Sequence, residues 1–200
     1  MSEPIVRLEG VTRTYEQGAQ RVAAVADLSL LVQPGEFTVL SGPSGSGKTT
    51  TLNLIGALDR PTAGKVWVDG RDLSTLSRSQ QSVLRRDRIG FVFQAYNLIA
   101  TLTAFENAEF VLALQGVGTK ERRAKVGALL AEVGLAGLEE RRPDELSGGQ
   151  QQRVAIARAI AHDPAIVLAD EPTANVDSAT AESLLALMER LNHERGITFL

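Results

Sequence analysis

Residues 42–49 have the residue types and the spacing of a phosphate-binding loop. They read Gly-Pro-Ser-Gly-Ser-Gly-Lys-Thr and match the pattern G-x-x-x-x-G-K-[ST]. Glycines let the backbone turn tightly enough for its N–H groups to point inward at phosphate oxygens. Lys48 would neutralise the β- and γ-phosphates, and the Thr49 hydroxyl would coordinate Mg²⁺. The predicted phosphate-binding set is Gly42, Pro43, Ser44, Gly45, Ser46, Gly47, Lys48, Thr49 and Thr50.

Two adjacent carboxylates supply the second half of such a site. Asp170 and Glu171 follow residues 165–169, an apolar run typical of a strand buried on both faces of a parallel sheet. Neighbouring residues at a strand end point in different directions, so the two side chains can divide the work. We expect Asp170 to hold Mg²⁺ and Glu171 to act as general base for an attacking water. The simpler alternative is a pair of surface charges at the start of a turn that contains Pro172.

The elements that must position these residues include both strands and helices. Apolar residues at i, i+3, i+4 and i+7 predict one helix around residues 126–133 and another around residues 184–191. Asp177 or Ser178 would cap the second helix, and Asp69-Gly70 is typical of a hairpin turn. Short strand patterns are found at residues 4–8, 28–32, 37–40, 65–69, 89–93 and 197–200.

Composition limits the class of protein. The chain has 200 residues, of which 44% are apolar and 22% charged, as expected for one globular domain. Its net charge of −3 argues against a protein that coats nucleic acid, and its lack of cysteine excludes disulfides and zinc–thiolate sites. No apolar run approaches the roughly 20 residues of a membrane span, and the first residues contain no hydrophobic targeting core. We therefore expect a soluble cytoplasmic domain.

A second motif narrows the choice among phosphate-loop proteins. Residues 146–150 read Leu-Ser-Gly-Gly-Gln and precede the helical pattern of residues 151–159. This segment resembles the signature motif and helix of the ATP-binding-cassette (ABC) ATPases, although it could also be a capped helix with no further role. In that family the signature of one subunit closes over the γ-phosphate held by the loop of the other. The residues that match the signature are Leu146, Ser147, Gly148, Gly149 and Gln150.

Three further residues match the family in order along the chain. Tyr15 lies where the family places an aromatic ring that stacks on adenine; the alternative is a core tyrosine. Gln94 resembles the Q-loop glutamine, which contacts Mg²⁺ or the attacking water, unless it is an inert loop residue. Asp177 resembles the D-loop aspartate, and it could instead, or also, cap a helix. The D-loop-like residues Asn175-Val176 depart from the commoner Ala-Leu.

The family's switch histidine has no counterpart in the chain. His193 precedes the strand pattern of residues 197–200, and His162 is interpreted as a solvated residue at a helix end. From this resemblance we expect a chain that lacks the C-terminal end of the family and hydrolyses ATP poorly by itself.

The resemblance implies an α/β fold of the P-loop NTPase, ABC-ATPase type, in which a parallel-sheet core carries an antiparallel β subdomain and a helical subdomain. A single domain would span residues 1–200. The antiparallel layer would comprise residues 1–36 and 62–72, and the helical subdomain residues 96–161. The core would comprise residues 37–61, 88–95 and 162–200.

Within the family, residues 58–64, 89–94 and 97–107 resemble the macrolide-exporter and lipoprotein-releasing group. The implied function is that of an ATP-binding and ATP-hydrolysing motor subunit that uses Mg²⁺. Two copies would form a head-to-tail dimer on transmembrane permease subunits at the cytoplasmic face of the membrane, with no nucleic-acid partner.

Two alternatives remain at this stage. A non-transport ABC ATPase is disfavoured because no sustained heptad repeat separates Lys48 from Ser147 and only one cassette is present. The second alternative is a nucleotide-gated regulatory module that binds without turnover. The Asp170-Glu171 pair argues against it, whereas the missing switch histidine argues for it.

Overall fold

The computed structural model describes residues 3–18 and 20–200, and its N-terminal part is an antiparallel sheet. The strands are β1 (Val6–Gln17), β2 (Gln20–Val32), β3 (Ala63–Val68) and β4 (Arg71–Asp72), in the order β2-β1-β3-β4. Asp69 and Gly70, between β3 and β4, have φ values of 50° and 70°. Positive φ at both positions is what a tight two-residue hairpin requires, so the predicted turn is confirmed.

A second sheet is parallel. It pairs β5 (Ile89–Phe93) with β6 (Ile166–Asp170), in a register that joins Phe93 to Asp170. Single bridges extend it, since Phe199 pairs with Val167 on one side and with Phe37 on the other. The predicted strands at residues 37–40 and 197–200 are therefore reduced to isolated bridges. Val39, two residues after the bridge at Phe37, is 74% exposed.

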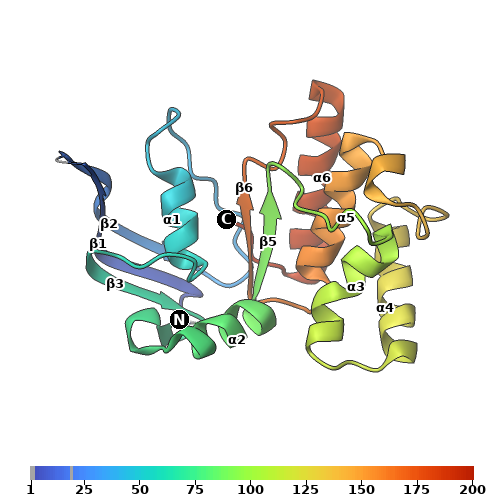
Figure 1. Ribbon diagram of the computed structural model, residues 1–200, viewed down its shortest axis with the longest axis horizontal. Coiled ribbons are helices and arrows are strands. Elements are labelled where there is room, and N and C mark those ends of the chain that lie inside the picture. Colours follow the sequence, from blue (N-terminus) through green and yellow to red (C-terminus); the bar gives the residue numbers. More distant parts are fainter. Residues whose placement is uncertain (1–2, 19) are drawn as a thin grey trace.

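Helices cover both sides of the parallel strands. Helix α1 (Lys48–Ile55) lies between the antiparallel sheet and β6, and α2 (Arg78–Arg88) leads directly into β5 (Figure 1). The other helices gather on the opposite side of β5 and β6. These are α3 (Ala104–Leu114), α4 (Thr119–Glu132), α5 (Gly148–Ile160) and α6 (Ser178–Arg195), with short 3-10 turns at Leu73–Thr75 and Pro143–Glu145.

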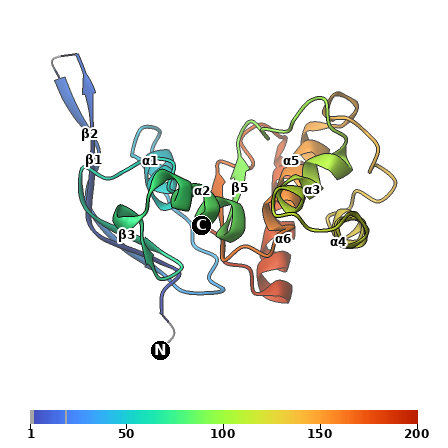
Figure 2. The ribbon, with the colours of Figure 1, turned by 60° about the horizontal axis from the view of Figure 1, so that its bottom comes forward.

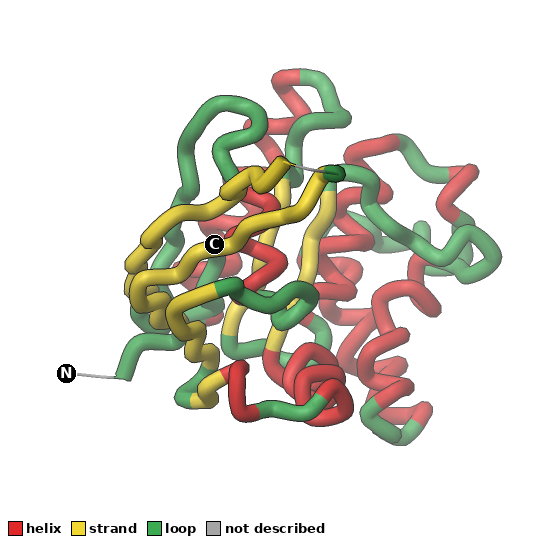
Figure 3. The backbone as a smooth tube through the Cα atoms, turned by 60° about the vertical axis from the view of Figure 1, so that its left-hand side comes forward, coloured by secondary structure: helices red, strands yellow, loops and turns green. Residues whose placement is uncertain are grey.

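Two hydrophobic cores meet at the parallel strands. On β6, Val167 packs with the helices α3 to α6, whereas its neighbours Ile166 and Leu168 pack with α1 and the antiparallel sheet. Alternate residues of a strand face opposite sides, so β6 is buried on both faces, as its apolar run predicted. In Figure 3 the antiparallel strands lie in front of the two parallel strands, and most helices lie behind.

The pairing of Phe93 with Asp170 places the C-terminal ends of both parallel strands at one edge of the sheet. The loops that follow, beginning at Gln94 and Glu171, leave the sheet side by side. This edge of an open parallel sheet is where ligands usually bind. Among the helices of the described residues, none has the length and apolar character needed to cross a membrane.

Candidate functional site

The glycine-rich loop ends in an uncapped helix. Gly45 and Gly47 have φ values of 80° and 92°, and a Cβ on Gly47 would lie 2.1 Å from the carbonyl oxygen of Ala24. Only glycine fits this position. Gly47 is the N-cap of α1 and offers no side-chain hydrogen bond, so the N–H groups of the first helical turn remain available to an anion.

The predicted lysine, threonine and carboxylates come together at this helix start. The Nζ atom of Lys48 donates to the carbonyl oxygens of Gly42 at 2.9 Å and Pro43 at 3.2 Å, which places the amine over the loop. The hydroxyl of Thr49 donates to Oδ1 of Asp170 at 3.0 Å. Glu171 lines a pocket of about 180 Å³ with the loop residues Ser44, Gly45, Gly47, Lys48, Thr49 and Thr50.

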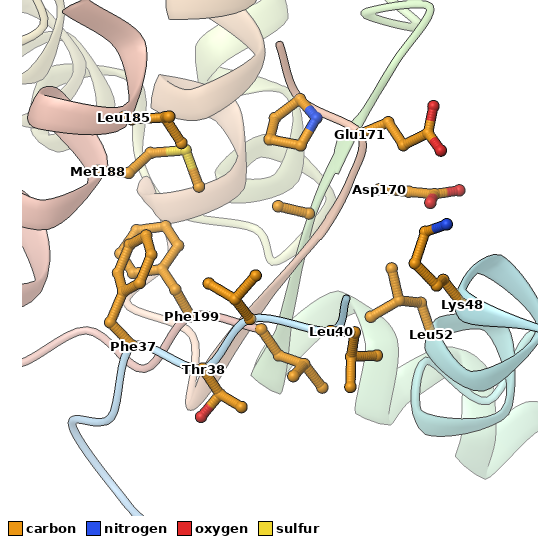
Figure 4. A pocket seen from close by; sticks show the side chains of 14 residues that line it. Phe37, Thr38, Leu40, Lys48, Leu52, Asp170, Glu171, Leu185, Met188 and Phe199 are labelled. Atoms are coloured by element: carbon orange, nitrogen blue, oxygen red, sulfur yellow. The ribbon is translucent and has the colours of Figure 1, made fainter. Parts of the chain in front are cut away.

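A larger apolar cavity of about 190 Å³ opens beside these groups (Figure 4). Its ionisable residues are Lys48, Asp170 and Glu171, which lie together at one end, whereas Phe37 and Met188 line the other. The sequence contained no signal for this cavity, because its walls come from five separate segments of the chain.

The residues present fit a magnesium–nucleotide complex better than a stand-alone metal site. In the part of the chain that the structure describes, no three His, Cys, Asp or Glu side chains are grouped to hold a metal. Mg²⁺ is usually bound by one or two protein groups together with phosphate oxygens and water. The Thr49 hydroxyl and the Asp170 carboxylate, which are in hydrogen-bond contact, provide such a pair.

Tyr15 lies on β1 in a polar cluster that the sequence did not predict. Its hydroxyl donates to Oδ2 of Asp59 at 2.7 Å, and the guanidinium of Arg13 lies 4.4 Å from the ring centre. Burial would raise the pKa of Asp59, but the hydrogen bond from Tyr15 and the charge of Arg13 outweigh it and lower the pKa. Tyr15 is half-buried and bonded at its polar end, so it is not a core tyrosine. Adenine stacking on its ring stays a prediction.

Gln94 and the D-loop-like segment contact each other. The Nδ2 group of Asn175 donates to the backbone carbonyl of Gln94 at 2.9 Å. Asp177 caps α6, where it accepts hydrogen bonds from the backbone N–H of Thr180 at 3.0 Å and from its hydroxyl at 2.6 Å. These bonds lower the pKa of Asp177. The capping role is therefore confirmed, and a second role towards a nucleotide stays a prediction.

The signature residues begin α5 with a side-chain cap. Ser147 Oγ accepts from the N–H of Gln150 at 3.3 Å, and Gln150 Oε1 accepts from the N–H of Ser147 at 2.8 Å. Ser147 is exposed, whereas Leu146 is buried. The two described pockets that contain Lys48 and Glu171 have no signature residue in their walls. The chain therefore does not bring its own signature to its own phosphate loop.

The interpretation of His162 as a solvated residue is wrong. Its exposed fraction is only 8%, and burial lowers its pKa to about 4. The physical reason lies in the packing of α5 against β5. Gly90 allows this approach, since a Cβ there would lie 2.1 Å from the carbonyl oxygen of Ala159. Because α5 packs this closely on β5, His162, which follows the helix, is buried.

Comparison with known proteins identifies the family. The profile of the family described as "ABC transporter" matches residues 25–174, a span that contains the phosphate loop, the signature and both carboxylates. The chain belongs to the ABC transporter family.

Curated relatives of this ABC domain differ in how much of their length it covers. The macrolide export ATP-binding/permease protein MacB of Syntrophobacter fumaroxidans is 46% identical over 198 residues, which are 98% of this chain but only 28% of that protein. The uncharacterized ABC transporter ATP-binding protein MJ0796 of Methanocaldococcus jannaschii is also 46% identical, over 97% of this chain and 84% of its own length.

Solved structures confirm the expected fold class. The dimeric structure of the bacterial ABC transporter cassette MJ0796 has a TM-score of 0.89 at 44% identity and covers 97% of this chain and 85% of its own. A dimeric post-hydrolysis state of MJ0796 bound to ADP and Pi has a TM-score of 0.88 at 45% identity, with the same coverage. This ABC domain therefore has the mixed parallel and antiparallel α/β fold of an ABC-type ATPase.

Proposed function

We propose that this ABC domain binds ATP with Mg²⁺ and hydrolyses it. The observation that carries the proposal is the meeting of the uncapped start of α1 with the carboxylates at the end of β6, through the contact between Thr49 and Asp170. The Nζ atom of Lys48 donates to two carbonyl oxygens of the loop, and phosphate oxygens would replace these two acceptors when ATP binds. When bound, Mg²⁺ supplies positive charge to the β- and γ-phosphate oxygens.

The remaining roles follow from position. Thr49 and Asp170 hold the metal, and Glu171 accepts the proton of the attacking water as general base. Gln94, at the end of the neighbouring strand, contacts the metal or that water. Tyr15 stacks on the adenine. Phosphoryl transfer depends mainly on positioning and on charge neutralisation, and these residues provide both.

The second proposed feature is a head-to-tail dimer in which Ser147 of each copy meets the nucleotide of the other. Its support is the separation of the two helix starts, since α5 lies across the parallel strands from α1 (Figures 1 and 2). The solved MJ0796 structures are dimers. A two-fold dimer could bring the α5 start of one copy to the α1 start of the other.

A mixing experiment tests the dimer. We expect neither Lys48→Ala nor Ser147→Arg to form ATP-dependent homodimers in light scattering. A mixture of the two should regain dimers, because one hybrid site keeps an intact loop and an intact signature. If both variants form full ATP-dependent homodimers by themselves, the shared site is wrong.

The third proposed feature is docking on paired membrane subunits at the cytoplasmic face, as in a transporter. The name of the MacB relative combines an ATP-binding protein with a permease. We place the docking segment in residues 96–113, because several apolar side chains gather there among few charges. The structure divides these side chains into two groups. Leu98 and Phe105 pack against the core, whereas Ile99 and Phe110 are each 37% exposed and line a groove of about 420 Å³. Of these four side chains, only Ile99 and Phe110 line the groove and are open to a partner.

A matched pair of variants tests the groove. Ile99→Asp combined with Phe110→Asp should abolish co-purification with the permease while ATP affinity is unchanged. Leu114→Asp is the control, because Leu114 is 57% exposed on the same helix, α3, but does not line the groove. Retained co-purification of the double variant would rule out docking at this surface.

A further inference from the structure

Three segments that are distant in the sequence meet beside the nucleotide site. They are the loop after β5, which begins at Gln94, the loop after β6, which contains Asn175, and the start of α5 at Gly148. The contact is close, since a Cβ on Gly148 would lie 2.8 Å from the hydroxyl of Tyr96 and 3.8 Å from the carbonyl oxygen of Asn175. We call this meeting point, formed by Gln94, Tyr96, Gly148 and Asn175, the junction.

Asn175 uses both halves of its side-chain amide on Gln94. Its Nδ2 group donates to the backbone carbonyl of Gln94 at 2.9 Å, and its Oδ1 atom accepts from Nε2 of Gln94 at 3.5 Å. Within the described residues, the side chain of Gln94 has no other hydrogen bond. The backbone of Asn175 is held separately, because its carbonyl accepts from the hydroxyl of Tyr96 at 3.2 Å.

The backbone around the junction is held from α5. The buried Gln152 donates from Nε2 to the carbonyl oxygens of Pro172 at 2.6 Å and Phe93 at 3.4 Å. The guanidinium of Arg158 donates to the carbonyls of Tyr96 at 2.9 Å and Asn97 at 2.6 Å. Both loops therefore have fixed main chains, and what remains to be set is the direction of the Gln94 side chain.

We propose that Asn175 is a positioning residue that sets the orientation of the Gln94 amide for catalysis. The oxygen and the nitrogen of a planar amide lie on opposite sides of its carbon, so an Nε2 group directed at Asn175 leaves Oε1 turned away from it. Oε1 is the atom of this amide that can bind Mg²⁺ or accept a proton from water. The Ala-Leu sequence that is commoner at these positions has neither a donor nor an acceptor for this contact. The inference rests on the proposed role of Gln94.

Asn175→Ala removes both bonds and, measured in the full-length protein, should lower kcat for ATP about 3- to 10-fold, as expected for one or two exposed hydrogen bonds. The KM for ATP should stay within about twofold, because the phosphate loop is untouched. The Mg²⁺ concentration for half-maximal rate should rise. Asn175→Asp keeps the shape but replaces the donor by a carboxylate facing the Gln94 carbonyl, so it should not restore the rate. Glu182→Gln, an exposed change on α6, is the control.

A double-mutant cycle with Gln94→Ala decides whether Asn175 acts through Gln94. The variant with both alanines should be no slower than Gln94→Ala alone. If the two losses multiply, or if Asn175→Ala turns over at the wild-type rate while Gln94→Ala does not, the inference is wrong and the role of Gln94 stands. If Gln94→Ala itself has wild-type turnover, the proposed role of Gln94 fails and the inference fails with it. Equal thermal melting of Asn175→Ala and the control excludes a loss through unfolding.

Discussion

Helices α1 and α5 both begin beside glycines, but only α5 has a side chain that caps the N–H groups of its first turn. At α1 the N-cap is Gly47 in a left-handed conformation, with no side chain to occupy those groups. At α5 the N-cap is Ser147, which forms a reciprocal pair of hydrogen bonds with Gln150. A helix start attracts anions through its unpaired N–H groups, so of these two helices α1 offers the more open phosphate site.

The surroundings of the two helices also differ, because one start is open to solvent and the other helix is anchored by buried side chains. The loop before α1 is exposed at Ser44 and Ser46, so a ligand can reach it from solvent. Helix α5 is anchored by the buried Gln152 and by Arg158, and the buried His162 follows its end. Under the proposed function, the start of α1 would receive the nucleotide, and the start of α5 would be the surface that a second copy uses. The predictions below test this division.

The largest expected effect lies on the α1 side. In the full-length protein, Glu171→Gln should keep ATP affinity, because Lys48, Thr49 and Asp170 remain, but should lower turnover by about 10²- to 10⁴-fold through loss of the general base. Phosphate release measured beside equilibrium nucleotide binding separates the two quantities. Turnover within twofold of the wild type would show that Glu171 is not the general base.

Alanine at a glycine of each helix start compares the two directly. In Gly47→Ala the new Cβ meets the fixed backbone oxygen of Ala24 at 2.1 Å, and φ is 92°, so ATP affinity should fall by at least about 10²-fold. In Gly148→Ala the Cβ meets the tip of Tyr96 at 2.8 Å, which can rotate away. ATP binding to a single chain should then be unchanged. Equal losses of ATP affinity in both variants would contradict the division.

His162 tests how firmly the end of α5 is buried. Its pKa of about 4 lies below the ordinary 6.5, so as pH falls from 6.5 towards 4 the unfolded chain takes up a proton that the folded chain does not. The free energy of unfolding therefore decreases over this range, by about 2 kcal/mol at pH 5. His162→Gln should lose that part of the pH dependence in denaturant titrations at pH 7.5 and pH 5. The exposed His193→Gln should keep it, and identical behaviour of the two variants would refute the assignment.

Local patterns in the sequence predicted much of this arrangement. Ser147 and Asp177 are helix caps, β5 spans residues 89–93 as expected, and Lys48, Thr49, Asp170 and Glu171 come together. Each of these depends on neighbouring residues or on a motif with a fixed spacing. The roles of the site residues themselves stay predictions.

The features that the sequence did not predict depend on distant segments. His162 is enclosed because Gly90, on another element, lets α5 approach β5. Asp59, which follows α1, contacts Tyr15 and Arg13 of β1, a strand more than 40 residues earlier in the chain. Residues 37–40 look like a strand, but a ladder needs paired neighbours, and Val39 has none among the described residues. Patterns along one segment contain no information about such contacts.

The smallest expected effect concerns Ser147, where stability and function can be separated. Ser147→Ala removes one cap and should lower the free energy of unfolding by about 1 kcal/mol, or the Tm by about 2–4 °C for a chain of this size. ATP affinity of the single chain should not change, because α1 keeps its open N–H groups and Lys48. ATP-dependent dimerisation should weaken, since the hydroxyl that would reach the second nucleotide is gone. Ser147→Thr, which keeps both the cap and the hydroxyl, should restore stability and dimerisation together. If Ser147→Ala instead loses ATP affinity in the single chain, then α5 contributes to the nucleotide site of its own chain. The proposed division of roles between the starts of α1 and α5 would then be wrong.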